Sequence, residues 1–219
     1  MPSQALINQF VNAPHQFMRA YLVAWRGAAP EDQQNIQVVM RNWGTGRRRT
    51  GAVFLGMGNA KETVDRFELR WADDPYNGAQ PGEHQFSAVW SGYKGRQARI
   101  AQLGQAGGPS LMLTPELTGC AVVRAFADDG SARFGHYNLV KPGTDTVQDD
   151  DDMRQAIDQD FAGAAHATMT KGDYRARGKR SDAVRVTVVG HRVGTQWRFW
   201  AQYREDKPSG QQLRHVELL

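Results

Sequence analysis

Residues 120–140 read CAVVRAFADDGSARFGHYNLV and contain two β-like runs. Cys120–Ala127 and Arg133–Val140 are rich in β-branched and aromatic residues, which are typical of strands. Asp128–Ser131 between them has the Asp-Asp-Gly-Ser composition of a tight turn. The stretch therefore predicts an antiparallel pair of strands joined by a short loop.

Further β-like runs, separated by Gly-rich turns, surround this pair. The predicted strands before it are Ile36–Arg41, Thr50–Leu55, Val64–Trp71, His84–Trp90, Arg99–Leu103 and Ser110–Leu113. After it, apolar and polar residues alternate around Val184–Val188, Trp197–Tyr203 and Leu213–Leu218. Gly44-Thr45-Gly46 predicts a turn between strands, because no Gly-Lys-Ser/Thr follows to complete a phosphate-binding loop.

Helical spacing of apolar residues occurs at the start of the chain and again after residue 149. Ser3 is a candidate N-cap for the first helix, and the apolar stretch Phe17–Trp25 continues the helical region after a turn at Ala13-Pro14. Asp149–Asp152 provides a cap and an acidic first turn for a later helix. The apolar ladder of that helix is Met153, Ile157, Phe161 and Ala165.

These patterns predict one mixed α/β domain over residues 1–219. We expect two packed, mostly antiparallel mixed β-sheets in a sandwich-like arrangement, with a few peripheral helices. Of the 219 residues, 40% are hydrophobic and 23% are charged, so a full core can form without disulfides. No repeat or Pro/Ser-rich linker divides the chain.

Several classes of protein and site are excluded by composition and spacing. No apolar run reaches the roughly 20 residues of a membrane span, and Arg19 interrupts Phe17–Trp25 with no cleavage site after it. One cysteine allows no internal disulfide and no Cys-rich metal site. The six histidines lack metal-ligand spacing, and Gly-x-Ser-x-Gly is absent. We therefore expect no metal site and no serine nucleophile elbow.

The distribution of basic residues is compatible with several kinds of partner. The net charge is +4, and basic residues cluster at Arg47–Arg49 and at Arg175, Arg177, Lys179 and Arg180. Such clusters can bind nucleic acid, an anionic membrane or an acidic protein, or they can be solvated loops that keep the protein soluble. No helix-turn-helix, aromatic RNA-binding signature or zinc finger is present, so we do not expect a nucleic-acid partner.

The single cysteine, Cys120, and His136 on the next predicted strand offer a nucleophile and a base. An imidazole can take the thiol proton and create a thiolate–imidazolium pair. Gly119 has no side chain, so a substrate amide can approach the backbone, and the Cys120 N–H is then a candidate oxyanion donor. No Asp or Glu is an obvious third group, but Thr114 could hold the imidazole through its hydroxyl or its carbonyl.

Two observations favour a structural role for Cys120 instead. Free cysteine is among the most buried residue types and usually packs as a small apolar residue. A two-residue turn at Asp129-Gly130 would also place Cys120 opposite Leu139. His136 would then lie opposite Val123, about 10 Å from Cys120 along the strand. A wider loop, a bulge or a different neighbouring strand is needed to bring the two together.

Leu117-Thr118-Gly119-Cys120, followed sixteen residues later by His136, resembles the glutamine deamidase toxins of the cytotoxic necrotizing factor and Burkholderia lethal factor group. The lethal-factor branch also has a threonine six residues before its cysteine, and Thr114 occupies that position here. The resemblance covers Thr114–His136. The interval from Cys120 to His136 is longer than in the lethal factor and nearer to that of the necrotizing factors.

The resemblance implies an α/β core of mixed sheets and an enzyme without metal or cofactor. It also implies that Cys120, His136 and Thr114 are catalytic, with Gly119 and the Cys120 backbone at the oxyanion. Such an enzyme converts a glutamine side-chain amide of a host protein to glutamate. The expected partner is a Rho-family GTPase or a translation initiation helicase, the substrates of the two branches. An amine in place of water would give transglutamination.

Two other functions stay open. A bacterial chemoreceptor deamidase shares the Cys-His-Thr set and acts in the bacterial cytoplasm. A non-enzymatic basic module would use Cys120 as a core residue and bind RNA or an acidic protein through its arginines. For the toxin or effector function, we expect a monomer that is secreted or injected without a cleaved signal peptide and acts in the host cytosol.

Overall fold

A computed structural model describes residues 1–27, 35–49, 61–92, 97–141, 143–177, 184–208 and 210–219. The predicted strand Thr50–Leu55 lies outside these residues. Within them the fold is mixed α/β, with many strands and four helices. None of these helices is long and apolar enough to cross a membrane.

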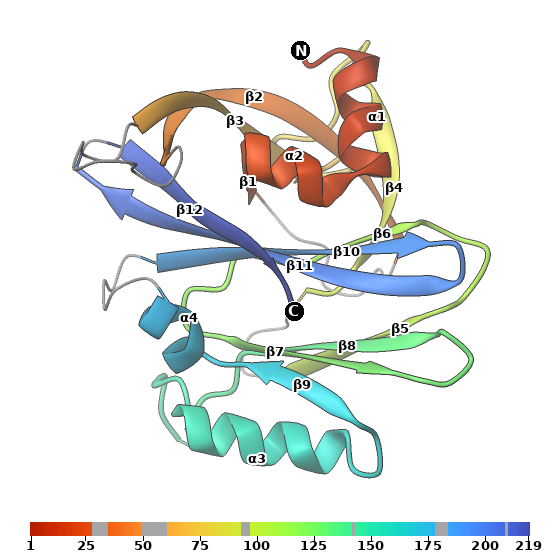
Figure 1. Cartoon of the computed structure of the whole chain (residues 1–219), viewed down its shortest axis with the longest axis vertical. Helices are drawn as coiled ribbons and strands as arrows, with labels where there is room; N and C mark the ends of the chain where they lie inside the picture. Colours follow the sequence, from red (N-terminus) through yellow and green to blue (C-terminus); the bar gives the residue numbers. More distant parts are fainter. Residues whose placement is uncertain (28–34, 50–60, 93–96, 142, 178–183, 209) are drawn as a thin grey trace, which may run out of the picture.

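Six strands of the described residues form a closed barrel. Their order around the ring is β2 (Asn35–Arg49), β12 (Gly210–Leu218), β11 (Gln196–Lys207), β10 (Val184–Val193), β6 (Leu111–Leu113) and β4 (Gln85–Trp90). Strand β3 (Lys61–Trp71) pairs with the other edge of β2, and β1 (Leu22–Trp25) runs parallel to β3. The barrel forms the upper part of the molecule in Figure 1.

The sandwich-like arrangement expected from the sequence is wrong for this larger sheet. Strand β2 is 15 residues long, whereas the sequence predicted a strand only over Ile36–Arg41. One edge of β2 pairs with β4 at Asn35–Val39 and with β12 at Arg47 and Arg48, which closes the ring. The barrel was missed because a strand of the predicted length cannot hold both partners.

A separate four-stranded sheet packs against the outside of the barrel. Its order is β5 (Ala98–Leu103), β8 (Ala132–Tyr137), β7 (Ala121–Phe126) and β9 (His166–Met169). One face contacts β10 and β11 through an apolar core that includes Phe134 and Phe199, whose rings are stacked with their centroids 5.0 Å apart. Helix α3 (Asp150–Asp160) covers the other face (Figure 1). The fold therefore has three layers: barrel, sheet and helix.

Two of the four described helices begin at predicted caps, but the helical segments differ from prediction in extent and number. Ser3 caps α1 (Gln4–Asn12), and Asp149 caps α3 by accepting a hydrogen bond from the Asp152 N–H at 3.0 Å. The segment Phe17–Trp25 is not one helix: α2 (Pro14–Ala20) ends and β1 begins at Leu22. Helix α3 stops before Phe161 and Ala165. Strand β9 and helix α4 (Lys171–Arg177) were not predicted.

Strand β1 is held by side chains as well as by β3. The Val23 N–H donates to Gln202 Oε1 at 2.9 Å, and the Val23 carbonyl accepts from Thr187 Oγ1 and Arg204 Nη1, each at 2.9 Å. These polar residues alternate with apolar ones along β10 and β11, and alternation predicts that they face water. They are buried instead, because the small sheet covers one face of these strands and the barrel interior covers the other.

The loop between β7 and β8 differs from the predicted two-residue turn. The Ala127 N–H donates to the Ser131 carbonyl at 3.0 Å, so three residues form the loop, and Gly130 at its end has φ 85°. A three-residue hairpin with a left-handed last residue is a common alternative to the two-residue turn. Its register places Val122, not Val123, opposite His136. A shift of one residue moves every side chain of a strand to the other face.

Gly44 and Gly46 lie inside β2 and not in a turn between strands. Asn42 pairs with Phe67 and Thr45 with Asp65, so Trp43 and Gly44 together lie opposite the one residue Arg66. This two-against-one pairing is a β-bulge. Gly44 takes the left-handed conformation there, with φ 92°, and its N–H donates to Asn42 Oδ1 at 2.9 Å. The bulge bends β2, as the closing strand of a barrel requires.

Candidate functional site

The three predicted catalytic residues lie between the barrel and the small sheet. Thr114 directly follows β6, His136 is in β8, and Cys120 directly precedes β7. All three side chains are buried, with exposed fractions of 2% for Thr114, 0% for His136 and 5% for Cys120. The site is thus built from two sheets, and the packing of one on the other brings it together.

Thr114 and His136 are in direct contact. The Thr114 Oγ1 lies 2.5 Å from Nδ1 of His136, a short hydrogen bond whose direction depends on which ring nitrogen carries the proton. Thr114 precedes Pro115, which favours an extended backbone at Thr114. The side chain of Thr114 therefore points out of the barrel towards the small sheet and holds one nitrogen of the imidazole.

Cys120 and His136 lie on the same face of the small sheet. Val122 pairs with His136, and directly opposite residues of an antiparallel pair share a face. Cys120 is two residues from Val122, so its side chain points to that face as well. The offset between Cys120 and His136 is then one diagonal step of the ladder, shorter than predicted. A hydrogen bond between Sγ and the ring stays a prediction.

Burial opposes ionisation of both Cys120 and His136. Desolvation raises the pKa of the Cys120 thiol to about 12, and a hydrogen bond from the Gly119 backbone N–H offsets this only in part. Complete burial lowers the pKa of His136 to about 3. At neutral pH the closed site therefore holds a neutral thiol and a neutral imidazole.

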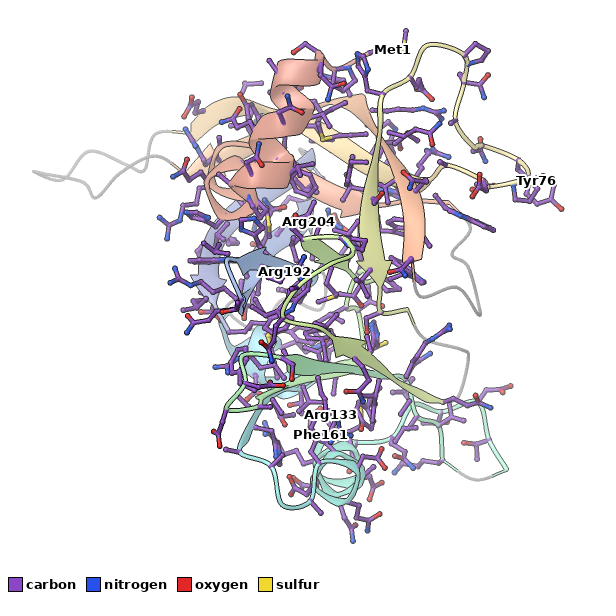
Figure 2. All side chains as sticks on the ribbon, turned by 90° about the vertical axis from the view of Figure 1, so that its right-hand side faces the viewer. Met1, Tyr76, Arg133, Phe161, Arg192 and Arg204 are labelled. Atoms are coloured by element: carbon purple, nitrogen blue, oxygen red, sulfur yellow. The ribbon has the colours of Figure 1, made fainter. Side chains whose placement is uncertain are left out.

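The loop from Thr114 to Cys120 is anchored at several points. Leu117 exchanges two backbone hydrogen bonds with Val186 of β10, at 2.8 and 3.2 Å. The Glu116 carboxylate forms an ion pair with Arg204, whose side chain is fully buried (Figure 2). The Tyr174 hydroxyl of α4 donates weakly to the Cys120 carbonyl, at 3.5 Å. The backbone that carries Cys120 is therefore held on both sides.

Sequence reasoning missed Glu116 and Tyr174. Glu116 gave a weak signal, since it is the one charged residue between Thr114 and Cys120. Its partner Arg204 gave none, because strand alternation places a polar residue on the solvent side. Tyr174 lies in a helix that was not predicted, so its contact with Cys120 could not be expected.

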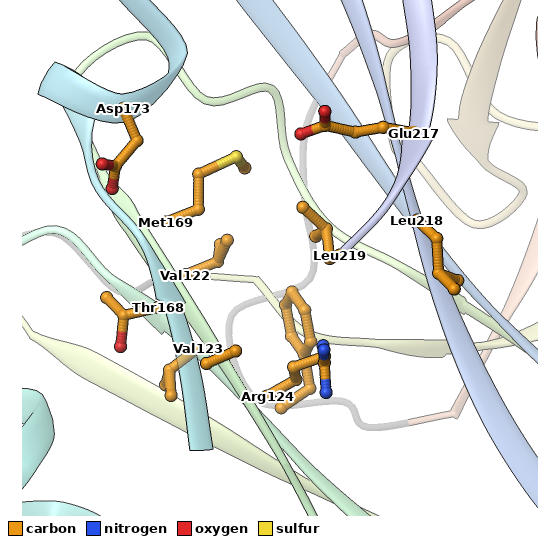
Figure 3. Close-up of a pocket in the computed structure, with 11 residues that line it drawn as sticks. Val122, Val123, Arg124, Thr168, Met169, Asp173, Glu217, Leu218 and Leu219 are labelled. Carbon is orange, nitrogen blue, oxygen red and sulfur yellow. The ribbon is translucent and has the colours of Figure 1, made fainter.

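Space for a substrate lies beside the site. A side chain at Gly119 would meet no heavy atom within 4 Å, so open space borders the residue before Cys120. A cavity of about 240 Å³ lies between β7 and β9 on one side and the end of β12 on the other (Figure 3). Val122 lines this cavity, and Asp173 and Glu217 approach it from opposite sides (Figure 3). Cys120, Thr114 and His136 are not part of its lining.

The predicted basic clusters are only partly described. Arg47 is exposed at the end of β2, whereas Arg48 pairs with Glu62 at 2.6 Å. Arg175 lies in α4, and Lys179 and Arg180 lie outside the described residues. No group of three or more His, Cys, Asp or Glu side chains within the described ranges is arranged to hold a metal ion.

Comparison with known proteins does not add to this geometry. No protein-family model matches the chain, and a search of curated proteins finds no relative. The link to the deamidase toxins therefore rests on the motif Thr114–His136 alone.

Proposed function

We propose that the chain is a cysteine-dependent protein glutamine deamidase. The observation that carries the proposal is the 2.5 Å contact between Thr114 Oγ1 and His136 Nδ1. It supports a site in which Thr114 holds Nδ1 and leaves Nε2 for the proton of Cys120, a residue on the same face of the sheet. A threonine placed for packing alone has no need to meet the imidazole.

The chemistry uses only groups of this chain and water. Cys120 Sγ loses its proton to His136 Nε2 and attacks the side-chain carbonyl carbon of glutamine. The Cys120 N–H stabilises the oxyanion, and the carbon–nitrogen bond breaks as the imidazolium protonates the departing ammonia. His136 then takes a proton from water, which attacks the thioester. The products are glutamate, ammonia and the free thiol.

The neutral resting state places a condition on this mechanism. A thiol with a pKa near 12 and an imidazole with a pKa near 3 do not exchange a proton at pH 7 while the site stays dry. Proton transfer must therefore accompany entry of the substrate amide from the open side at Gly119. Such a site is inert towards small electrophiles until a substrate enters it.

The substrate class follows the resemblance. We propose a host protein as substrate, either a Rho-family GTPase or a translation initiation helicase, modified in the host cytosol. The deamidase of a bacterial chemoreceptor would use the same three residues, so the proposed chemistry does not depend on the choice.

The proposal is tested by incubating the protein with candidate substrates and measuring ammonia release together with glutamine-to-glutamate conversion by mass spectrometry. Cys120→Ala keeps a small apolar side chain in the core, and we expect it to fold and to release no ammonia. Cys120→Ser also loses activity, since its hydroxyl is far less acidic than a thiol. Deamidation by either variant at the wild-type rate would exclude Cys120 as the nucleophile.

Thr114→Val tests the contact that carries the proposal. It removes only the hydroxyl, and we expect turnover to fall by about one to two orders of magnitude, the scale of a lost buried hydrogen bond. Thr187→Val is the matched control, because it removes another buried hydroxyl, the one that donates to Val23. The control should lose stability without losing turnover. A fully active Thr114→Val protein would remove Thr114 from the site.

A further inference from the structure

A second polar cluster lies at the bulge of β2, away from the cysteine. Because Trp43 and Gly44 share one position opposite Arg66, the bulge turns Trp43 towards Arg66. The guanidinium carbon of Arg66 lies 4.3 Å from the centre of the Trp43 ring. Trp43 is 39% exposed, so its ring is also in contact with solvent.

Arg26, the residue directly after β1, joins the same cluster. Leu22 pairs with Arg66, and Arg26 continues the face of Leu22 four residues later. The Arg26 N–H donates to the Leu69 carbonyl at 2.9 Å, which keeps its backbone in line with the sheet. The guanidinium carbon of Arg26 lies 3.9 Å from the centre of the Trp43 ring. Two guanidiniums are therefore held against one indole.

Among the described residues, no acid forms an ion pair with either of these two arginines. Within the described part of the chain, neither Arg26 nor Arg66 has a carboxylate within 4 Å, and Arg26 Nε is buried without a hydrogen-bond partner. Three other arginines of β2 and β3 are paired with acids, whereas Arg47 at the exposed end of β2 has no such pair among the described residues. These pairs are Arg41 with Glu83, Arg48 with Glu62, and Arg70 with Glu68.

The two carboxylates that raise the pKa of Arg66 already form ion pairs with other arginines. Burial lowers the pKa of Arg66, the positive charges of Arg204 and Arg26 lower it further, and Asp206 and Glu116 raise it in return. Asp206, however, binds Arg185 at 2.5 Å, and Glu116 binds Arg204. The fold thus keeps two like charges together at a cost that a bound anion would offset.

We propose that Arg26 and Arg66, held by Trp43, form a binding site for a phosphate monoester. Two guanidiniums carry a charge of about +2, and a phosphate monoester carries about −1.5 to −2 at pH 7, so the charges match. Guanidiniums present forked N–H donors that bind phosphate oxygens in pairs. A single carboxylate would neutralise only one of the two charges.

The monoester has two chemical sources, a small soluble phosphate compound or the headgroup of a lipid such as phosphatidic acid. The experiment uses both, with the full chain at low ionic strength. Isothermal titration with inorganic phosphate tests the soluble source. Co-sedimentation with vesicles containing phosphatidic acid, against vesicles of phosphatidylcholine alone, tests the lipid source. Binding in either arm supports the site and identifies the source.

The variants decide whether binding occurs at this cluster. We expect Arg26→Gln and Arg66→Gln each to weaken phosphate binding by about tenfold or more, the scale of lost charge-assisted hydrogen bonds. Arg198→Gln is the matched control, since it removes the same charge from an exposed position on β11 and should change affinity less than about twofold. Trp43→Phe keeps a ring for the guanidiniums and should bind phosphate, whereas Trp43→Ala should bind weakly.

A dependence on pH gives a further readout that packing alone would not produce. The second pKa of a phosphate monoester is about 6, so affinity should fall between pH 7.5 and 5.5 as the dianion is lost. Equal weakening by Arg198→Gln and Arg66→Gln would show binding to the overall charge and overturn the proposal. So would the absence of binding in both arms with phosphate at about 10 mM, well above a weak dissociation constant.

Discussion

Thr114, Cys120 and His136 lie between two packed sheets, whereas Arg26, Trp43 and Arg66 form an outer cluster at the bulge of β2. In the first group burial raises the pKa of Cys120 and lowers the pKa of His136, which favours the neutral form of both side chains. In the second group two positive charges stay together, partly exposed and without a carboxylate within 4 Å in the described residues. Both groups are polar, yet one has lost its charge and the other has kept it.

The difference shows that the depth of a polar group decides what it can do at rest. A buried thiol and imidazole are held in place but are not ionised, so under the proposed function a substrate must enter before proton transfer begins. The guanidiniums of Arg26 and Arg66 are partly exposed, and their positive charges can attract an anion over a Debye length. The side chains of the interior site are fixed in position and neutral, whereas those of the outer cluster carry charge without a ligand.

The largest expected effect concerns the reactivity of Cys120. With a pKa of about 12, its thiolate fraction at pH 7.5 is about a thousandfold or more below that of an ordinary thiol. We expect alkylation by iodoacetamide to be slower than that of the urea-unfolded chain by at least this factor, and to rise with pH. Mass spectrometry measures the rate. A fast reaction with a midpoint near pH 7 would show a preformed thiolate–imidazolium pair and remove the contrast.

The second effect compares a buried ion pair with an exposed one. Glu116→Gln leaves the fully buried guanidinium of Arg204 without its counter-charge, and we expect a loss of about 3 kcal/mol in the free energy of unfolding. Glu62→Gln breaks the more exposed pair with Arg48 and should cost less than about 1 kcal/mol. Urea unfolding followed by circular dichroism measures both. Equal losses would mean that burial does not set the strength of these pairs.

The third effect is the dependence of stability on pH. The folded pKa of His136 is about 3 and the unfolded value is near 6.5, so the unfolded chain binds more protons between these values. Stability therefore falls as the pH drops through this window, by about 2 kcal/mol between pH 7 and 5 for His136. The difference in slope between wild type and His136→Gln isolates this residue from other histidines. Identical slopes would contradict a neutral, buried His136.

The smallest effect is expected at the outer cluster. Arg66→Gln removes one of two like charges but also a cation–π contact, so stability should change by less than about 0.5 kcal/mol. Thermal melting at low and high salt measures this change. Added phosphate should then raise the melting temperature of wild type but not of Arg66→Gln. A large destabilisation by Arg66→Gln would show that the cluster is a structural element.

Most strands could be predicted from sequence because their apolar residues follow local patterns. The predictions failed where a distant partner decides the structure. Leu22–Trp25 is apolar enough for a helix or a strand, and only pairing with β3 makes it a strand. The closure of the barrel depends on which residues of β2 meet β4 and β12, and no local pattern specifies that.

The candidate site shows the same limit more sharply. The motif located Thr114, Cys120 and His136, but their arrangement depended on a single choice of turn. A two-residue turn puts Cys120 and His136 on opposite faces, and the three-residue turn with Gly130 at φ 85° puts them on the same face. Both turns suit the sequence Asp-Asp-Gly-Ser, so the sequence alone could not choose between them.

The pairing of the barrel strands has a further consequence for how the molecule can open. Among the described residues, every pairing within the ring is antiparallel except two, β2 with β12 and β4 with β6, and each of these joins two residue pairs. The ring therefore consists of two half-shells. One is formed by β2 and β4, which lie before Ser91 in the sequence, and the other by β6, β10, β11 and β12, which lie after Pro109. The two short parallel pairings are the seams that join them. Amides of so short a seam are expected to exchange with solvent before those of the long ladders. Leu113 lies in the second seam and Thr114 follows it, so a parting of the half-shells would reach the hydroxyl that holds His136.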